Sequence, residues 1–337
     1  MNSVFRVTIG IVTLVSATVE LTSFSGAASA ETVTIFVGNA AGGGYDLYAR
    51  VLARFLGNHL PGNPKIIVSN MLGAGSLKAA NYLYNVAPKD GTAIGIVTEM
   101  LALEQASGNP AVQYDSARFN WVGRMAPNLA IHFQWHTSNV QSIDDARRTK
   151  TLVAAAGVGN ISETIPILLN SVIGTKFEIV RGYGGVTEGM LAMERGEVEG
   201  TASSWAAINI NKASWLREKK IKIILQDLPA RGTELPDVPA LGELADNDAD
   251  RDLLGLYGAG GLIGRAFLAP PDMDRVTVER LQTGFDKTAT DPRYLQAMRD
   301  ANLEQDPMSG DALREIVLRS LNVPAAVKDR ARAIFGR

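Results

Sequence analysis

Apolar residues along this chain fall into two alternating patterns, which predict strands and helices in turn. Short continuous apolar runs predict strands at residues 32–37, 64–69, 92–97, 151–156, 176–181, 197–202 and 220–225. Apolar positions three and four apart predict helices at residues 45–60, 76–84, 161–172 and 186–195. The first of these helices has an expected apolar face of Leu47, Val51, Leu52, Phe55 and Leu56. Apolar strands separated by helices favour parallel sheets covered on both faces.

The strand and helix pattern runs through the chain twice, and this indicates two α/β lobes. Residues 119–135 hold two strand-like runs interrupted by Pro127, which predicts a crossing between the lobes. A segment rich in Pro, Asp and Gly precedes an apolar return segment, and the tail is mostly helical. We therefore expect residues 31–129 and 251–337 to form the first lobe, and residues 130–250 to form the second.

Residues 1–30 have the pattern of a secretory signal peptide. Arg6 precedes an apolar stretch, which ends before Glu20, and the segment closes with Ala-Ser-Ala at residues 28–30. The apolar stretch is too short to span a bilayer stably. We expect export to the periplasm with cleavage after Ala30, and an uncleaved anchor is the alternative.

Composition then excludes several classes of function. The chain has 337 residues, of which 46% are hydrophobic and 20% charged, and its formal net charge is −2, as in an ordinary globular protein. Near-neutral charge gives no electrostatic basis for binding nucleic acid. The absence of cysteine excludes disulfides, thiolate metal sites and a cysteine nucleophile.

Four glycine-rich turns each follow a predicted strand and open a helix, at residues 40–46, 73–76, 156–160 and 181–185. Glycine lets a ligand approach the backbone, and the start of a helix offers unpaired N–H groups at the positive end of its dipole. Such turns facing one cleft would suit an anionic ligand. Each turn alone could equally be a tight connection, and Asp46 is either an acid that complements the helix dipole or an acceptor for a ligand.

Motifs of catalysis are missing from the sequence. It contains no G-x-G-x-x-G, no P-loop and no G-x-S-x-G motif. His132 and His136 have the spacing of a metal pair, but no third ligand lies near them in sequence. We expect no metal, no cofactor and no enzymatic activity. Core packing is the expectation for Trp205 and Trp215, although ASSW (202–205) follows a strand and could border the cleft.

These segments resemble the periplasmic receptors of tripartite tricarboxylate transporters, which include the Bug proteins, over residues 31–320. GGGYDLYARVLARFL (42–56) is similar to the family's P-G-G-x-x-D opening, and VSNMLGAGSLKAANYLYNVAPKDGTAIGIV (68–97) is similar to its most specific stretch. The resemblance implies a two-lobe α/β periplasmic binding protein of the type II, Venus-flytrap kind. It also implies a ligand that is a small di- or tricarboxylate, passed to a membrane permease, and we expect the receptor to be a monomer.

The resemblance also implies which residues hold the ligand, through backbone amides of both lobes. The residues implicated in the first lobe are Gly43, Gly44, Tyr45, Asp46, Gly75 and Ser76, and those in the second are Gly159, Asn160 and Tyr183. Ser203, after a predicted strand, is expected at the same cleft.

The sequence departs from the family pattern at several of these positions. Ala41 replaces the usual proline, Asn160 replaces a serine, and Arg181-Gly182 precedes Tyr183 in place of valine-proline. The sequence leaves open whether Arg181 or Trp205 lines the pocket. Two other functions also stay open: a co-receptor that presents its ligand to a periplasmic sensor kinase, and a periplasmic enzyme acting on a carboxylate.

Overall fold

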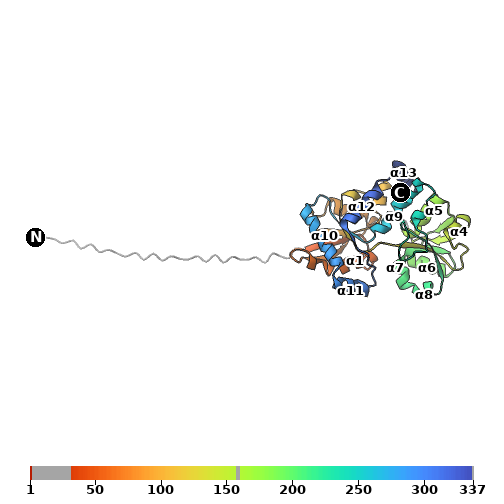
Figure 1. The fold of residues 1–337 in the computed structure, drawn as a ribbon, viewed down its shortest axis with the longest axis horizontal. Coiled ribbons are helices and arrows are strands. Elements are labelled where there is room, and N and C mark those ends of the chain that lie inside the picture. Colours follow the sequence, from red (N-terminus) through yellow and green to blue (C-terminus); the bar gives the residue numbers. More distant parts are fainter. Residues whose placement is uncertain (2–31, 157–159, 336–337) are drawn as a thin grey trace.

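The computed structural model describes residues 1, 32–156 and 160–335. Residues 32–156 and 160–335 form two α/β lobes side by side (Figure 1). The expected signal peptide and Gly159 lie outside the described residues. Among the helices that the structure does describe, none combines the length and the apolar character needed to cross a membrane.

The first lobe is built on a six-stranded sheet with the order β11-β4-β10-β3-β1-β2. Its strands are β1 (Thr32–Val37), β2 (Lys65–Asn70), β3 (Ala93–Ile96), β4 (Asn120–Arg124), β10 (Ala266–Ala269) and β11 (Met308–Ser309). β1 runs parallel to β2 and β3, as predicted, but β10 is antiparallel to β3 and β4. The expectation of a wholly parallel sheet is wrong here. The chain re-enters the lobe at the carboxyl end of β3, where Phe267 of β10 pairs with Ile96, so β10 runs in the opposite direction.

Helices cover both faces of this sheet. They are α1 (Gly44–Ala53), α2 (Leu77–Asn85), α3 (Leu101–Ala106), α10 (Arg275–Ala289), α11 (Pro292–Asp300) and α12 (Gly310–Leu321), with short 3-10 turns at Leu56–His59, Ala74–Ser76 and Ser116–Arg118. One apolar cluster joins α1, α10 and α11 to the sheet, and a second joins α2 and α12 to its other face. The cores of the lobe therefore lie on the two sides of the sheet, as the apolar strands predict.

The second lobe is built on a five-stranded sheet with the order β7-β6-β8-β5-β9. Its elements are β5 (Ala130–Trp135), α4 (Ile143–Arg148), β6 (Thr151–Ala154), α5 (Ile161–Ile173), β7 (Phe177–Val180), α6 (Val186–Glu194), β8 (Gly200–Ser204), α7 (Trp205–Asn211), α8 (Ala213–Arg217), β9 (Ile221–Gln226) and the 3-10 turn Leu241–Leu244. β6 is parallel to β7 and β8, whereas β5 is antiparallel to β8 and β9. The helices α4 and α5 cover one face, and α6, α7 and α8 cover the other.

Helix α9 (Asp248–Ile263) is the main element that the sequence pattern missed. Its first half packs into the core of the second lobe and its last turns pack into the core of the first, so that it spans both (Figure 1). Helix α13 (Ala325–Phe335) packs beside α9 on the cluster of the second sheet. The exact division of the chain between lobes stays a prediction, since α9 and α13 belong to the shared region.

Helix α1 is shorter than predicted. It ends at Ala53, and a separate 3-10 turn follows, because the chain must bend where Gly57 meets the next segment. A Cβ at Gly57 would lie only 2.4 Å from the carbonyl oxygen of Pro64. Leu47, expected on the buried face, is 40% exposed, because it faces the space between the lobes.

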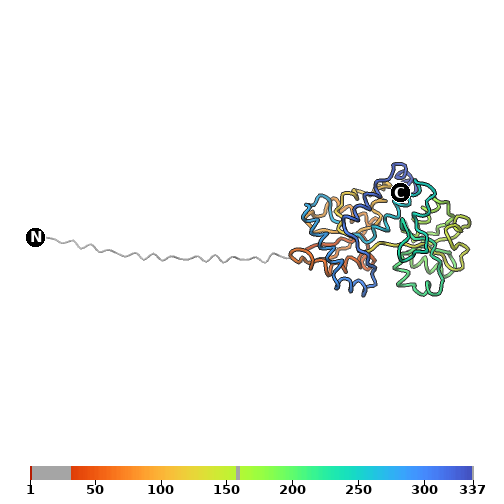
Figure 2. Tube along the Cα trace, viewed as in Figure 1, coloured from red at the N-terminus to blue at the C-terminus, as the bar shows by residue number. Residues whose placement is uncertain are grey.

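Two crossings of the chain connect the lobes, the first between β4 and β5 and the second between β9 and β10, which includes α9 (Figure 2). The two crossings are hydrogen-bonded to each other. The amide of Arg265 donates to the carbonyl of Ala126 at 2.8 Å, and the amide of Asp227 donates to the carbonyl of Ala130 at 3.0 Å. Gly264, just after α9, has a φ of 55°, and a Cβ there would lie 2.4 Å from the carbonyl oxygen of Ala126. Glycine is therefore required where the crossings touch.

We predict that Gly264→Ala lowers the free energy of unfolding by about 2 kcal/mol or more, because the new methyl meets the other crossing at an unfavourable φ. Chemical denaturation measures the change. Gly255→Ala in α9 is the matched control, since a Cβ there meets nothing within 4 Å. This control should gain up to about 1 kcal/mol through helix propensity. Equal stability of the two variants would contradict the packing described.

Candidate functional site

A cavity of about 300 Å³ lies between the lobes, on the side where α1 faces α7. Its lining residues come from both lobes and from the crossings, and they are Gly44, Leu47, Tyr48, Pro127, Asn128, Leu129, Ser204, Ala206, Ala207, Ile210, Asn211, Arg265, Asn302, Leu303 and Glu304. A volume of this size suits a small molecule. Since both lobes contribute walls, relative movement of the lobes would change the shape of this cavity.

Arg265 brings a positive charge to this cavity from the second crossing. Its guanidinium stacks on the ring of Tyr45, with Cζ 4.2 Å from the ring centroid. A Cβ on Gly44 would lie 3.5 Å from Arg265 Nη2, so the guanidinium adjoins the first turn of α1. No direct ion pair joins Arg265 to a carboxylate within residues 32–156 and 160–335. Its charge is thus available to a ligand.

A chain of hydrogen bonds fixes the position of this guanidinium. Arg265 Nη2 donates to Asn128 Oδ1 at 2.9 Å, and Asn128 Nδ2 donates to Glu99 Oε1 at 2.6 Å. The backbone amide of Glu99 in turn donates to the hydroxyl of Tyr45 at 3.3 Å. The crossings, the end of β3 and the start of α1 therefore form one polar network, and Arg265 needs little reorganisation to meet an anion.

Asp46 braces the first glycine turn from within the lobe. The carboxylate is buried, and it accepts hydrogen bonds from Gly42 N at 2.8 Å, Arg50 Nε at 2.7 Å and Asn70 Nδ2 at 2.9 Å. Burial opposes ionisation, but these donors outweigh it and lower the pKa of Asp46 to about 2. Asp46 therefore stays ionised and holds the turn against the end of β2.

The second glycine turn adopts a left-handed backbone over several residues. Gly73, Ala74, Gly75 and Ser76 all have positive φ, which is uncommon for alanine and serine. The buried Ser76 hydroxyl donates to Asn39 Oδ1 at 2.9 Å, which ties this turn to the first one. Gly75 is exposed, and neither Gly75 nor Ser76 lines the cavity between the lobes.

The residues expected in the second lobe are more scattered. Asn160 caps α5, where its Oδ1 accepts from the Ser162 amide at 3.0 Å, and Tyr183 is half-buried in the turn after β7. Ser203 is buried in β8, next to Ser204, which lines the cavity. The structure thus places Gly44 at the cavity and Ser203 next to it, but it does not bring Asn160 or Tyr183 to its wall.

Arg181 and Trp205, for which the sequence left the position relative to the pocket open, do not line this cavity either. Arg181 Nε donates to Glu163 Oε1 at 2.6 Å, so its charge is already paired. Trp205 opens α7 between lining residues, and its buried indole Nε1 has no hydrogen-bond partner within the described ranges. Trp205 is therefore well placed to report changes at the cavity through its fluorescence.

Asp227 is a buried carboxyl where the second crossing leaves β9. Its Oδ1 accepts from the Ala130 amide at 2.8 Å. Burial, and then the nearby charge of Glu99, raises the pKa of Asp227 to about 8. The carboxyl is therefore mostly protonated at neutral pH, which spares the crossings a second negative charge beside Glu99.

The histidines do not form a metal site in the part of the chain that the structure covers. His132 is fully buried in β5, with Nδ1 2.9 Å from the carbonyl oxygen of Thr201, and burial lowers its pKa to about 4. His136 is exposed beyond the strand end. Among the described residues, no group of three or more His, Asp or Glu side chains could hold a metal ion.

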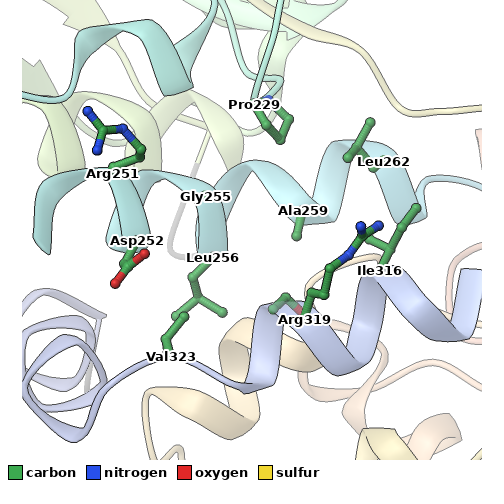
Figure 3. A pocket seen from close by; sticks show the side chains of 11 residues that line it. Pro229, Arg251, Asp252, Gly255, Leu256, Ala259, Leu262, Ile316, Arg319 and Val323 are labelled. Atoms are coloured by element: carbon green, nitrogen blue, oxygen red, sulfur yellow. The ribbon is translucent and has the colours of Figure 1, made fainter. Parts of the chain in front are cut away.

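Two further cavities adjoin the crossings. One of about 650 Å³ shares Pro127, Leu129 and Glu304 with the cavity between the lobes. The other, of about 270 Å³, lies between α9 and α12, and its rim carries Arg251 and Arg319 (Figure 3). Neither contains any residue expected from the sequence to bind the ligand.

The chain matches the model of one protein family. The model of the "tripartite tricarboxylate transporter family receptor", TctC, matches residues 48–322. No curated protein matches the chain in sequence.

Several solved structures share the two-lobe fold, which confirms the expected fold class. A TctC solute-binding protein from Polaromonas is 18% identical, with a TM-score of 0.67, over 89% of this chain and 97% of that protein. MatC from Rhodopseudomonas palustris with bound malate is 18% identical, with a TM-score of 0.59, over 90% and 98% of the two chains. A second R. palustris protein, with adipate, is 19% identical, with a TM-score of 0.61, over 90% and 97%.

We predict that Asp227→Asn removes a pH dependence of stability. The folded chain keeps the Asp227 proton up to a pKa of about 8, whereas the unfolded chain loses it near 4, so the folded state binds more protons between these values. Asp227 alone should therefore lower the free energy of unfolding as pH rises, by up to about 1.4 kcal/mol per pH unit.

Denaturation of both proteins between pH 5 and 8 measures this effect as the difference between them. Asparagine can still accept the Ala130 hydrogen bond, so the fold should be retained. Parallel pH curves for the two proteins would show that Asp227 is ionised in the folded state.

Proposed function

The chain belongs to the tripartite tricarboxylate transporter receptor family, and from this we propose that it captures a small carboxylate between its lobes and delivers it to the membrane permease of such a transporter. The family is one of binding proteins, and we propose that the chain performs no chemistry on its ligand. In keeping with the family, we place the protein in the periplasm, as a monomer released by cleavage after Ala30.

The observation that carries this proposal is the cavity to which Gly44 and Arg265 both contribute. Arginine pairs with a carboxylate through two parallel N–H donors, and this geometry adds orientation as well as free energy. The guanidinium adjoins the first turn of α1, where the backbone N–H groups lack partners within the helix. A carboxylate there would meet positive potential from both sources.

We infer that the glycine turns complete this site by their backbone amides. In the first lobe these are the amides around Gly43, Gly44 and Tyr45, with Asp46 keeping the turn in place rather than touching the ligand. The turn at Gly75 and Ser76 shapes the neighbouring wall.

The second lobe would add its contacts as the cleft closes. We assign this part to Gly159, Asn160, Tyr183 and Ser203. Ligand binding favours the closed state only through contacts made with both lobes at once.

The ligands of the structural relatives support a carboxylate of modest size. Malate and adipate are bound by two of the R. palustris proteins. Both are dicarboxylates with short carbon chains, and a cavity of about 300 Å³ with apolar side chains such as Leu47 and Ile210 can accept such a chain. We therefore propose that the ligand is an organic acid of comparable size.

We predict that Arg265→Gln weakens carboxylate binding by about tenfold to a hundredfold, because it removes a charge-assisted contact. Calorimetric titration with a panel containing malate, adipate, succinate and citrate identifies a ligand first, and a change in tryptophan fluorescence provides a second signal. Co-purifying acids should be identified by mass spectrometry before dialysis.

Arg319→Gln is the matched control. Arg319 also lines a cavity, the one between α9 and α12 (Figure 3), but it lies outside the proposed site. The control should bind the acid with unchanged affinity. An equal loss in both variants, or binding of no acid by the native protein, would refute the proposed site.

A further inference from the structure

The cavity between the lobes is lined by two side chains of opposite charge that do not form an ion pair with each other. Arg265 and Glu304 both line it, yet no ion pair joins them within the described ranges. We propose that the ligand is zwitterionic, with its carboxylate on Arg265 and a cationic nitrogen on Glu304. This inference rests on the proposed function and narrows the organic acid to an amino acid or a similar small molecule.

A hydrogen bond to its backbone positions Glu304, whereas its carboxylate makes no hydrogen bond or ion pair with the described residues. It lies in the segment between α11 and β11, where its carbonyl oxygen accepts a hydrogen bond from Tyr48 Oη at 3.0 Å. Within residues 32–156 and 160–335, its side chain has no hydrogen-bond or ion-pair partner. A half-buried carboxylate without a partner is costly, and a ligand cation would remove that cost.

Tyr48 contacts both residues. Arg265 Cζ lies 5.9 Å from the centroid of the Tyr48 ring, while the hydroxyl at the far end of that ring donates to the backbone carbonyl of Glu304. Stacking on Tyr45 and the hydrogen bond to Asn128 also anchor the guanidinium. The Arg265 guanidinium and the backbone of Glu304 are therefore both fixed beside one aromatic ring, and a ligand that spans the ring can reach both charged side chains.

The charges that face Glu304 favour a cation at this end of the cavity. Arg124 is already neutralised, since its Nη2 donates to Asp306 Oδ2 at 2.8 Å. Burial, followed by the negative charges of Glu234 and Asp306, raises the pKa of Glu304 to about 7, while Arg124 and Arg265 act in the opposite direction. A second carboxylate would meet like charge here or would require Glu304 to take up a proton.

The walls between the two charged ends are apolar. Leu47 of α1, Leu129 of the first crossing and Ile210 of α7 line the cavity, and Leu47 and Ile210 are 40% and 48% exposed. Such side chains suit the carbon chain of a ligand whose two ends are polar. The volume of about 300 Å³ limits that chain to a few carbons.

The test compares matched acids with and without an amino group. Calorimetric titrations of the ligand-free protein use L-glutamate against glutarate, L-aspartate against succinate, and 5-aminovalerate against valerate. We expect the amino compound of at least one pair to bind about tenfold or more tightly than its partner. Glu304→Gln should abolish this preference. Glu315→Gln, at an exposed position of α12 that is not among the charges acting on Glu304, is the matched control and should keep it.

Proton release distinguishes a contact at Glu304 from a general loss of fit. A cationic ligand group stabilises the ionised carboxylate, so binding near pH 7 should release part of a proton, which calorimetry in buffers of different ionisation enthalpy measures. The affinity for the amino compound should rise with pH up to about 7 and then level off. Glu304→Gln should lose both effects while its thermal unfolding stays cooperative.

The outcomes separate the two proposals. Tighter binding of an amino compound, lost in Glu304→Gln, supports the zwitterionic ligand. Equal or tighter binding of the acids without an amino group overturns it and leaves the proposed carboxylate receptor standing. A native protein that binds neither member of any pair, nor any acid of the carboxylate panel, overturns both.

Discussion

The pairing of the two crossings is the constraint on which the rest of the molecule depends. Arg265 bonds to Ala126 and Asp227 to Ala130, so the two segments that join the lobes behave as one short ribbon. Two hydrogen-bonded strands can twist and bend together, but they cannot slide independently without breaking these bonds. We therefore expect the lobes to move relative to each other by rotation about this ribbon. Helix α9 packs into both cores, so we expect any such motion to open the cavity on the side of α1 and α7.

The same ribbon buries polar groups that a purely structural connection would avoid. Glu99, Asn128 and Asp227 lie at the junction, and each has a hydrogen-bonded partner. Burying carboxyl groups costs free energy, and the raised pKa of Asp227 to about 8 records that cost. In return, Asn128 and Glu99 hold the guanidinium of Arg265 at the edge of the cavity. Apolar residues would therefore make the junction more stable. The polar network instead orients the charge of Arg265.

Local patterns in the sequence were sufficient for the lobes but not for the junction or the charged site. Strands such as β1 and β2 and the crossing at Pro127 follow from apolar runs and turn residues. Helix α9 was missed because glycines at positions such as 258 and 260 weaken a helical pattern, and its packing against both lobes overrides that propensity. Arg265 and Glu304 are remote in sequence from the glycine turns, so no spacing relates them. One signal for Arg265 was present in the sequence, because Arg265 is the single charged residue between positions 253 and 271.

Backbone amides and side-chain charges contribute differently to recognition in such a cleft. Amides of glycine turns attract any small anion, because every carboxylate offers the same two oxygens. Under our proposal, such amides would let one fold bind different acids, such as the malate and adipate bound by two structures that are 18% and 19% identical to this chain. Discrimination between acids must come from protein groups that contact the part of the ligand beyond this carboxylate. In our proposal those groups are Arg265 and Glu304, which lie beside Tyr48 and are supplied by segments outside the glycine turns. The fold can thus keep one mode of anion capture while the crossings and the segment before β11 change its specificity.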